Sequence, residues 1–460
     1  MASPQPTHAA THLADLPFQP LTELARRLAA GETTSVAIVE ACLANIDAQD
    51  EKLHAFVEVY REEAMRMAHA ADLERLAGFT RGLLHGLPIA IKDLFHIDRR
   101  QTTAGSKSWI GRIAESTAPS VQRLVAAGMI PIGKTHLVEF AYGTWGTNKP
   151  MGTPWNPWDL HVHRVAGGSS SGSAVAVAAG MAPAALGTDT GGSVRIPAAL
   201  CGLVGFKPTY GRIPLDGVVP LSPTLDSIGP IARTAEDAAL LVAAMAGEPL
   251  VPLRPVDSLD GVVITAVAHE QFPAFIEREI VEAYEETVVR LRELGAKVEL
   301  STIPFDFAAL GAKNGRIIGI EGYAQHRGVI DDDTADVDPG VRARMLIGKA
   351  STSTEYIEAL AGRQREIVRF AEWMRDRDAL MTPMLPITAR SVDEVDETTY
   401  PLATWSRAVN YLYACGVSVP CRLSQGGLPI GMQIVAAQGR DDAIVHLAEG
   451  LFQELSPRPS

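Results

Sequence analysis

The apolar positions in the first part of the chain recur with the spacing of amphipathic helices. In LTELARRLAAG, leucines and alanines fall at intervals of three and four residues, and the final glycine is placed to end the helix. Three consecutive hydroxyl residues (Thr33, Thr34 and Ser35) then offer N-caps to a second apolar-periodic stretch. A third helix is expected from about Val57. Residues 1–80 are therefore predicted to be helices that pack at the edge of a core.

The sequence pattern changes between residues 86 and 234, where short apolar runs alternate with glycines. Examples are LPIAIKDLF, AAGMIPIGKTH and AALGTDTGGSVRIPAAL. Runs of this length are typical of buried strands, and the glycines between them let the backbone approach a neighbouring group closely. This part of the chain is the expected floor of a functional site.

The last two hundred residues return to alternating strands and helices. A proline-rich stretch at 248–261 resembles a linker, after which GVVITAV and AKVELST bracket an amphipathic helix over about 276–294. This β-α-β pattern indicates parallel strands. Residues 305–350 show no clear period. A helix over 354–376, strand signals in ALMTP, VSVPCRL and LPIGMQIVA, and a final helix over about 441–455 complete an α/β chain.

Composition and charge exclude several classes of protein. The chain has 460 residues, is 47% hydrophobic and 21% charged, and carries 41 Lys and Arg against 54 Asp and Glu, for a net charge of −13. Because no run of basic residues exceeds two, nucleic-acid binding is disfavoured. The longest apolar run, 174–186, contains Gly180 and Pro183 and is too short to span a membrane.

The cysteines suggest neither a disulfide framework nor a zinc site. There are four in 460 residues, none is part of a C-x-x-C pair, and no signal peptide precedes them, so a cytoplasmic location is expected. They are Cys42, Cys201, Cys415 and Cys421.

Three short motifs match the sequence patterns of known sites, but the residues around them do not predict the structure that those sites need. Residues 128–135 satisfy the phosphate-loop pattern G-x-x-x-x-G-K-[ST], but a helical period precedes the loop and its interior, MIPI, is itself strand-like. GSSSG at 168–172 fits a nucleophile elbow with Ser170 as nucleophile, yet no buried strand precedes it. His161 and His163 lack a carboxylate or cysteine companion at metal-ligand spacing, which favours a solvated loop.

Three segments remain as candidate chemistry. Lys92 interrupts the apolar, strand-like run LPIAIKDLF, and burial would favour its neutral, basic form. AGGSSSGS at 166–173 places more serines before a small-residue helix than one N-cap requires. GTDTGGSVRIP at 187–197 can aim consecutive backbone amides at one point, the geometry of an oxyanion hole, and this run ends at Ser193.

Together these segments resemble the amidase signature family. The match runs from about 83 to 237 and resumes at GLPIGMQIVAA. The resemblance implies one domain over 1–460, in which 83–237 is the catalytic region and 262–460 completes the same core. The implied fold is a large, twisted, mixed β-sheet covered on both faces by helices. Ser171 departs from the glycine of many members, which is tolerable if its φ is ordinary.

The resemblance also implies roles for individual residues. Lys92 would be the base, Ser169 a bridging serine that follows a cis peptide bond, and Ser193 the nucleophile. Neutral Lys92 would take a proton from Ser169 while Ser169 takes one from Ser193. No metal or cofactor is implied. The oxyanion amides would be those of Thr190, Gly191, Gly192 and Ser193, with Asp189, Arg195 and Ser170 as structural support.

Arg195 carries one alternative, since arginine readily binds carboxylates: it could hold a substrate instead of pairing with Asp189. An aromatic cluster in FAYGTWGTNKPMGTPWNPWD suggests a substrate pocket at Tyr142, Gly143 and Trp145, although core packing is an equal alternative.

The expected substrate is a small carboxylic amide with an aryl or apolar group, and esters and carbamates share its carbonyl geometry. We expect a monomer or homodimer without a membrane or nucleic-acid partner. The alternative within the family is the A-type subunit of a glutamine amidotransferase, which serves ammonia to a partner. A phosphate-loop nucleotide-binding protein is the alternative from another class.

Overall fold

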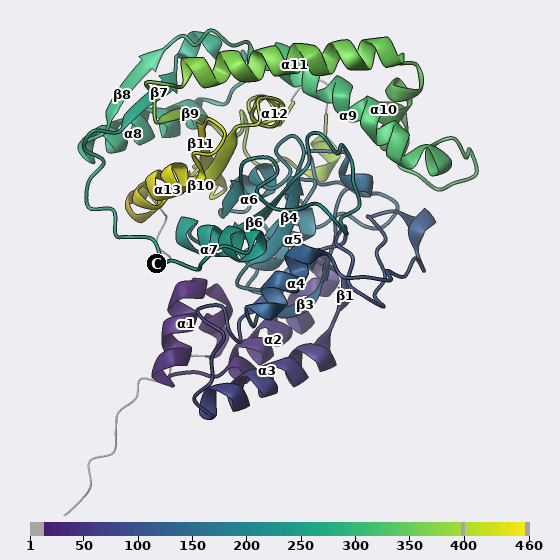
Figure 1. The fold of residues 1–460 in the computed structure, drawn as a ribbon, viewed down its shortest axis with the longest axis vertical. Helices are drawn as coiled ribbons and strands as arrows, with labels where there is room; N and C mark the ends of the chain where they lie inside the picture. Colours follow the sequence, from purple (N-terminus) through teal and green to yellow (C-terminus); the bar gives the residue numbers. More distant parts are fainter. Residues whose placement is uncertain (1–12, 397–400, 456–460) are drawn as a thin grey trace, which may run out of the picture.

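The computed structural model describes residues 13–396 and 401–455 and is built around one β-sheet (Figure 1). Its strands are β1 (Phe56–Val59), β2 (Pro88–Lys92), β3 (Ile130–Thr135), β4 (Ala185–Asp189), β5 (Val204–Lys207), β6 (Ser227–Ala232), β7 (Val263–Val267), β8 (Lys297–Ser301), β9 (Ala379–Pro383), β10 (Cys415–Leu423) and β11 (Pro429–Ala436). They lie in the spatial order β1-β3-β2-β4-β6-β5-β10-β11-β9-β7-β8.

Strand direction changes along this sheet. β2 pairs in parallel with β3 and β4, and β7 pairs in parallel with β8 and β9. From β4 through β6, β5, β10 and β11 to β9, all neighbours are antiparallel, as are β1 and β3. The sheet is therefore mixed and is flanked by helices, which confirms the predicted fold class.

The helices lie around the sheet (Figure 1). The α-helices are α1 (Leu21–Ala30), α2 (Ser35–Leu53), α3 (Arg61–Leu76), α4 (Pro119–Ala126), α5 (Ser171–Ala178), α6 (Arg195–Leu200), α7 (Ala235–Ala246), α8 (Arg278–Glu293), α9 (Phe307–Ile330), α10 (Pro339–Lys349), α11 (Ser353–Trp373), α12 (Ser406–Tyr411) and α13 (Asp441–Leu455). Short 3₁₀ helices are η1 (Leu13–Phe18), η2 (Lys107–Trp109), η3 (Glu139–Ala141), η4 (His269–Gln271) and η5 (Val392–Glu394).

The N-terminal helices lie at the β1 end of the sheet, as the apolar pattern predicted. The Thr34 side chain caps α2 by accepting from the Ala37 amide, and Gly31 ends α1 with a left-handed φ of 70°. The expected third helix begins later than predicted. Residues 56–59 instead form β1, since their backbone pairs with β3, and the helix starts only at Arg61.

The stretch without a clear period, 305–350, consists of α9 and α10, which pack closely together. A Cβ added at Gly348 would lie 2.3 Å from the Gly319 carbonyl oxygen, so the two helices meet through glycine backbone. Glycine at a contact position interrupts the apolar period, which explains why the sequence pattern failed here. The linker-like residues 248–261 contain neither helix nor strand, and the sheet continues on both sides of them.

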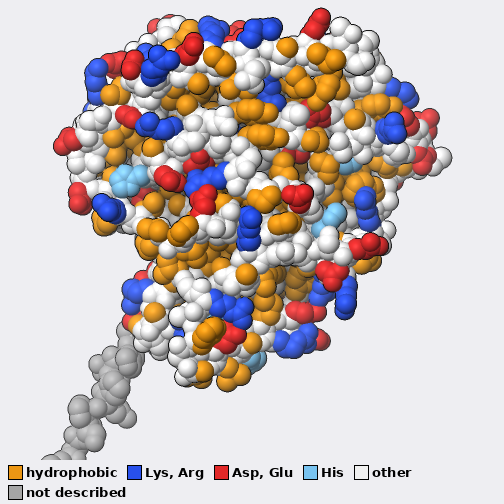
Figure 2. All heavy atoms as spheres, in the orientation of Figure 1, with side chains coloured by type: hydrophobic (Ala, Val, Ile, Leu, Met, Phe, Trp, Pro, Cys, Tyr) orange, Lys and Arg blue, Asp and Glu red, His pale blue; other side chains and the backbone are white. Residues whose placement is uncertain are grey.

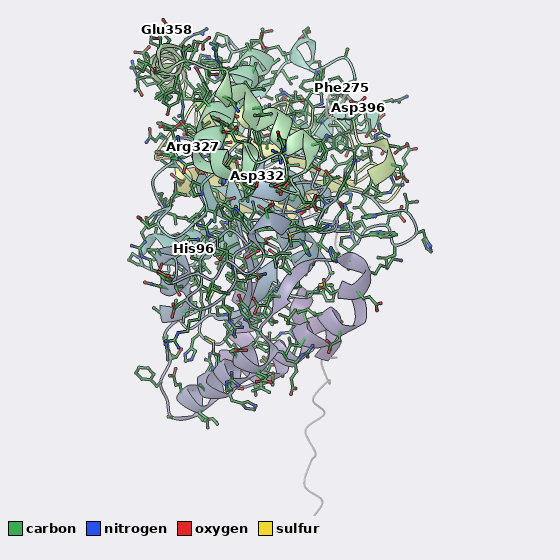
Figure 3. All side chains as sticks on the ribbon, turned by 90° about the vertical axis from the view of Figure 1, so that its right-hand side faces the viewer. His96, Phe275, Arg327, Asp332, Glu358 and Asp396 are labelled. Carbon is green, nitrogen blue, oxygen red and sulfur yellow. The ribbon has the colours of Figure 1, made fainter. Side chains whose placement is uncertain are left out.

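The outer surface carries charges of both signs. On the face shown in Figure 2, basic and acidic side chains are interspersed without an extended basic area. Figure 3 shows α11, marked by Glu358, at the opposite end of the molecule from the N-terminal helices. Within the described residues, no helix is both long and apolar enough to cross a membrane.

Candidate active site

Lys92 is the last residue of β2 and is fully buried. Its Nζ lies 2.8 Å from Ser169 Oγ and 2.9 Å from Thr188 Oγ1, and it donates a hydrogen bond to each. Burial lowers the pKa of Lys92 to about 7, although the nearby carboxylates of Asp189 and Asp226 act in the opposite direction. The lysine is therefore poised to exchange a proton with Ser169 near neutral pH.

Ser169 follows a cis peptide bond from Gly168, in agreement with the resemblance. The Val138 amide donates to the Ser169 carbonyl at 3.2 Å, and the amide of the next residue, Ser170, donates to the Ser193 carbonyl at 3.2 Å. The second of these contacts joins the Ser169–Ser170 segment directly to Ser193. Lys92, Ser169 and Ser193, which are 24 to 101 positions apart along the chain, thus meet at one place.

The serines of the two segments differ in exposure. Ser193 is 5% exposed, whereas Ser169 and Ser170 are fully buried. Ser170 is the N-cap residue of α5, and its Oγ lies 3.4 Å from the Thr188 carbonyl. Ser171 begins that helix and is not among the residues of positive φ, so serine fits in place of the usual glycine. This geometry favours Ser193 over Ser170 as the nucleophile.

The loop before Ser193 presents backbone amides, as the sequence predicted, with one difference. The Gly192 amide donates to Asp189 Oδ1 at 2.8 Å and is therefore already engaged. Within the described residues, the amides of Thr190, Gly191 and Ser193 have no acceptor. The amides of these three residues are therefore the ones available to an oxyanion, and the predicted oxyanion hole itself stays a prediction.

Asp189 and Arg195 form a fully buried ion pair at 2.8 Å. Burial alone would raise the pKa of Asp189, but the Arg195 guanidinium outweighs it and holds the pKa well below the usual range. Arg195 also donates to Gln433 Oε1 at 2.5 Å and to Asn410 Oδ1 at 2.7 Å. Because its hydrogen bonds go to buried protein groups, Arg195 supports the loop, and the alternative substrate-binding role does not fit this geometry.

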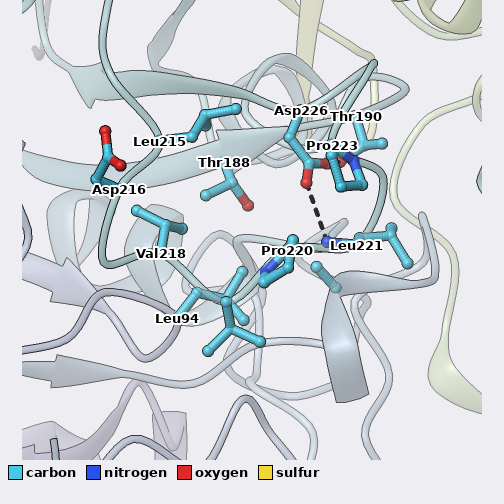
Figure 4. A pocket seen from close by; sticks show the side chains of 12 residues that line it. Leu94, Thr188, Thr190, Leu215, Asp216, Val218, Pro220, Leu221, Pro223 and Asp226 are labelled. Carbon is cyan, nitrogen blue, oxygen red and sulfur yellow. Dashed lines mark hydrogen bonds between the residues drawn. The ribbon is translucent and has the colours of Figure 1, made fainter. Parts of the chain in front are cut away.

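A pocket of about 280 Å³ opens beside Thr188 and Thr190 (Figure 4). Most of its wall is apolar, and the charged side chains among its lining residues are Asp216 and Asp226. Figure 4 shows Asp226 and Thr190 on one side of the pocket and Asp216 on the other. The lining residues are Leu94, Ala141, Thr188, Thr190, Leu215, Asp216, Val218, Val219, Pro220, Leu221, Pro223 and Asp226.

Asp226 connects this pocket to the oxyanion loop. Its Oδ1 accepts from Thr190 Oγ1 at 2.5 Å, and its Oδ2 accepts from the amides of Leu221 and Ser222, each at 3.0 Å. Burial raises the pKa of Asp226 to about 6, while these hydrogen bonds oppose that change. Asp226 therefore fixes Thr190 and one wall of the pocket at the same time.

The expected aromatic wall is not part of this pocket. Trp145 is 1% exposed and packs in a small apolar cluster with Val165 and Ile196. Tyr142 is buried too, with its hydroxyl 3.5 Å from the Gly315 carbonyl, while its neighbour Ala141 does line the pocket. Core packing, the equal alternative, thus accounts for Trp145, and a substrate contact by Tyr142 or Gly143 stays a prediction.

Comparisons with known proteins agree with this geometry. The family model described as Amidase matches residues 37–445. The chain belongs to the amidase family. A curated relative, the A-type subunit of the glutamyl-tRNA(Gln) amidotransferase of Streptomyces coelicolor, is 35% identical, with 92% of this chain and 93% of that protein covered.

Solved structures show the same relationship. A crystal structure of an amidase is 33% identical, has a TM-score of 0.87, and is matched over 95% of this chain and 100% of its own. The A-type subunit of the glutamyl-tRNA(Gln) amidotransferase from Thermotoga maritima is 31% identical and has a TM-score of 0.77. The match covers 95% of this chain and 94% of that chain.

The other motifs have structural roles in this amidase. The phosphate-loop match falls mostly on β3 and is strand, not loop. His163 stacks on Trp155 with ring centroids 4.4 Å apart, and no group of His, Cys, Asp and Glu that could hold a metal occurs in the described part of the chain. Sequence reasoning missed Thr188 and Asp226, although both lie in segments, GTDTGGS and SPTLDSIGP, that carry the family resemblance.

Proposed function

We propose that this amidase hydrolyses the C–N bond of a carboxylic amide through an acyl-enzyme on Ser193. Neutral Lys92 accepts the Ser169 proton while Ser169 accepts the Ser193 proton, and Ser193 Oγ forms a bond to the carbonyl carbon. The carbonyl oxygen becomes an oxyanion, which the loop amides stabilise. The observation that carries the proposal is the 2.8 Å contact between Lys92, whose pKa is about 7, and Ser169.

The second half of the reaction reverses the proton relay. As the C–N bond breaks, the proton held by Lys92 returns through Ser169 to the departing nitrogen, so an amine or ammonia leaves as a neutral molecule. Water then attacks the acyl-enzyme and gives its proton to the same relay. The C–O bond to Ser193 breaks, Ser193 regains its proton, and the products are a carboxylic acid and an amine.

The curated relatives favour glutamine as the amide. They are A-type subunits of glutamyl-tRNA(Gln) amidotransferases, and the one from Streptomyces coelicolor covers nearly the whole chain at 35% identity. In this role the chain would release ammonia from the glutamine side chain and serve it to a partner. This is the alternative that the sequence left open, and the curated relatives support it better than they support a stand-alone acylamide hydrolase.

The pocket favours a second candidate, a stand-alone amidase for apolar amides. Its wall is mainly aliphatic, and its two lining carboxylates, Asp216 and Asp226, would repel the α-carboxylate of glutamine. The higher TM-score of the amidase structure, 0.87 against 0.77, points the same way. Esters and carbamates with apolar groups belong to this candidate, because they place the same carbonyl over Ser193.

Two amides with the same leaving group separate the candidates. Glutamine and hexanamide both release ammonia, so one ammonia assay compares them on the purified chain, with Ser193→Ala as the blank. Glutamine hydrolysis that appears or rises with amidotransferase partner subunits supports the first candidate. Efficient hexanamide hydrolysis by the chain alone supports the second.

A pocket variant shows whether the aliphatic wall holds the acyl group. Val218→Phe narrows the pocket and should lower kcat/KM for hexanamide while leaving acetamide hydrolysis unchanged. If neither amide is hydrolysed in any combination, or if the Ser193→Ala chain releases ammonia as fast as the wild type, the proposed function is wrong.

A further inference from the structure

Three consecutive backbone carbonyls of the oxyanion loop each accept a hydrogen bond from a side chain far away in sequence. The donors come from α9 and α12, at least 120 positions from the loop, and all three are buried. The hydrogen bonds are Asn410 Nδ2 to the Asp189 carbonyl at 2.9 Å, Asn314 Nδ2 to the Thr190 carbonyl at 3.4 Å, and Ser406 Oγ to the Gly191 carbonyl at 2.7 Å.

A held carbonyl also fixes the direction of the next amide. In a planar trans peptide, the C=O of one residue and the N–H of the next point in opposite directions. The peptides of this loop are trans, since the cis bond of the described chain is that between Gly168 and Ser169. Holding the carbonyls of Asp189 and Thr190 therefore aims the amides of Thr190 and Gly191 away from α12 and α9.

The Gly191–Gly192 peptide shows this effect within the structure itself. Ser406 Oγ donates to the Gly191 carbonyl at 2.7 Å, and on the opposite side of the same peptide the Gly192 amide donates to Asp189 Oδ1 at 2.8 Å. This peptide is held at both ends. The carbonyl opposite the Ser193 amide is that of Gly192, which accepts from the Ile196 amide at 2.7 Å, so Ser406 holds the peptide that directly precedes this one.

The donors are themselves held in place. Ser406 and Asn410 lie four residues apart on α12, on one face of the helix. Arg195 donates to the Ser406 carbonyl at 3.2 Å and to Asn410 Oδ1 at 2.7 Å, which leaves Asn410 Nδ2 directed at the loop. The buried ion pair of Arg195 and Asp189 therefore fixes the loop and its tethers as one unit.

We propose that Ser406, Asn410 and Asn314 are positioning residues of the oxyanion hole. Asn410 and Asn314 orient the amides of Thr190 and Gly191 through the carbonyls on the other side of the peptide planes, and Ser406 fixes the Gly191–Gly192 peptide that lies between those amides and that of Ser193. None of the three has to touch substrate. The inference rests on the proposed function, because it takes Ser193 as the nucleophile. The Ser406 hydrogen bond is the shortest of the three, at 2.7 Å, and that of Asn314 is the longest, at 3.4 Å.

The test measures transition-state stabilisation without depending on the natural substrate. When a fluorophosphonate reacts with an activated serine, a P–O bond forms, the P–F bond breaks and fluoride leaves. The phosphoryl oxygen gains negative charge in the transition state, where the oxyanion hole stabilises it, so the second-order labelling rate at Ser193 reports on the loop. Ser406→Ala should lower this rate by roughly 10- to 100-fold, less than the loss of an oxyanion donor itself. Asn314→Ala should lower it by only a few fold, because its contact is the longest.

The matched control is Ser173→Ala. Ser173 is also a buried serine that donates to a backbone carbonyl at 2.8 Å, but its acceptor, Leu186, lies outside the oxyanion loop. Its labelling rate should stay within about twofold of the wild type. With an amide that the enzyme turns over, Ser406→Ala should lower kcat and leave KM nearly unchanged, and Ser406→Thr, which keeps the hydroxyl, should restore part of the loss.

The outcomes separate this inference from the proposed function. A wild-type chain that the fluorophosphonate labels at a residue other than Ser193, or not at all, overturns both. Labelling of Ser193 that is equally fast in the wild type and in folded Ser406→Ala overturns the inference alone. If Ser406→Ala does not fold, Asn314→Ala decides, and a labelling rate equal to that of the wild type overturns the inference.

Discussion

Lowering the pH from 8 to 5 should switch this amidase off through Lys92. Burial moves the pKa of Lys92 from 10.5 to about 7, so at ~1.36 kcal/mol per pH unit the folded protein disfavours the ammonium by ~5 kcal/mol. At pH 7.5 roughly three-quarters of the lysine is then neutral, against ~0.1% of an ordinary lysine. The neutral fraction falls roughly 100-fold between pH 8 and pH 5.

The assay is the pH dependence of kcat/KM, which reports on ionisations of the free enzyme. We expect activity to rise with pH, with a midpoint near 7 and a plateau above 8. The sign follows from the chemistry, because the ammonium cannot accept the Ser169 proton. Lys92→Arg, which stays cationic, and Lys92→Met, which has no base, should both lose nearly all activity and show no midpoint near 7.

Two results would refute this reasoning. A flat profile between pH 5 and pH 8 would mean that Lys92 does not titrate in this range. A midpoint near 7 that persists in the residual activity of Lys92→Met would assign the titration to another group. Circular dichroism at each pH is the control, since loss of the fold in acid would imitate the expected decline.

Three other perturbations test the loop and its supports. Gly192→Ala should abolish amide hydrolysis, because φ at Gly192 is +122° and the new Cβ would lie 2.3 Å from the Ser406 hydroxyl. Gly211→Ala, also at positive φ but in open space, should keep activity, and kcat/KM of the two variants is the measurement. Arg195→Met should lower the free energy of unfolding in urea by ~3–5 kcal/mol, because it leaves a buried carboxylate unpaired; a loss below 1 kcal/mol would contradict this. Asp226→Asn should move the midpoint of the pH profile to lower pH, because the Asp226 charge raises the pKa of Lys92; a move to higher pH would show the opposite coupling.

The site residues that are marked by their immediate neighbours in the chain can be predicted from the sequence. Lys92 stands out because it breaks an apolar strand, and Ser193 because it ends a run of small residues that can present amides. Both signals are local, since they depend on residues within about ten positions. The family resemblance adds Ser169 and the mixed sheet, neither of which follows from the residue pattern alone.

The parts that depend on tertiary contacts cannot be predicted in this way. Asn314, Ser406 and Asn410 reach the loop from α9 and α12, and nothing around them in the sequence marks them as donors to its carbonyls. The engagement of the Gly192 amide follows from where the Asp189 carboxylate folds back onto its own loop. The clustering of tryptophans does not decide whether Trp145 packs in a core or lines a pocket, because aromatic side chains cluster in both.

The nucleophile is the central claim, and peptide mapping of a trapped acyl-enzyme tests it most directly. The wild-type chain is mixed with an activated ester that acylates faster than it deacylates, quenched in acid, digested and analysed by mass spectrometry. We expect one acyl group on Ser193 in the wild-type chain and none in the Ser193→Ala chain. Acylation of Ser170, with Ser193 unmodified, would contradict it.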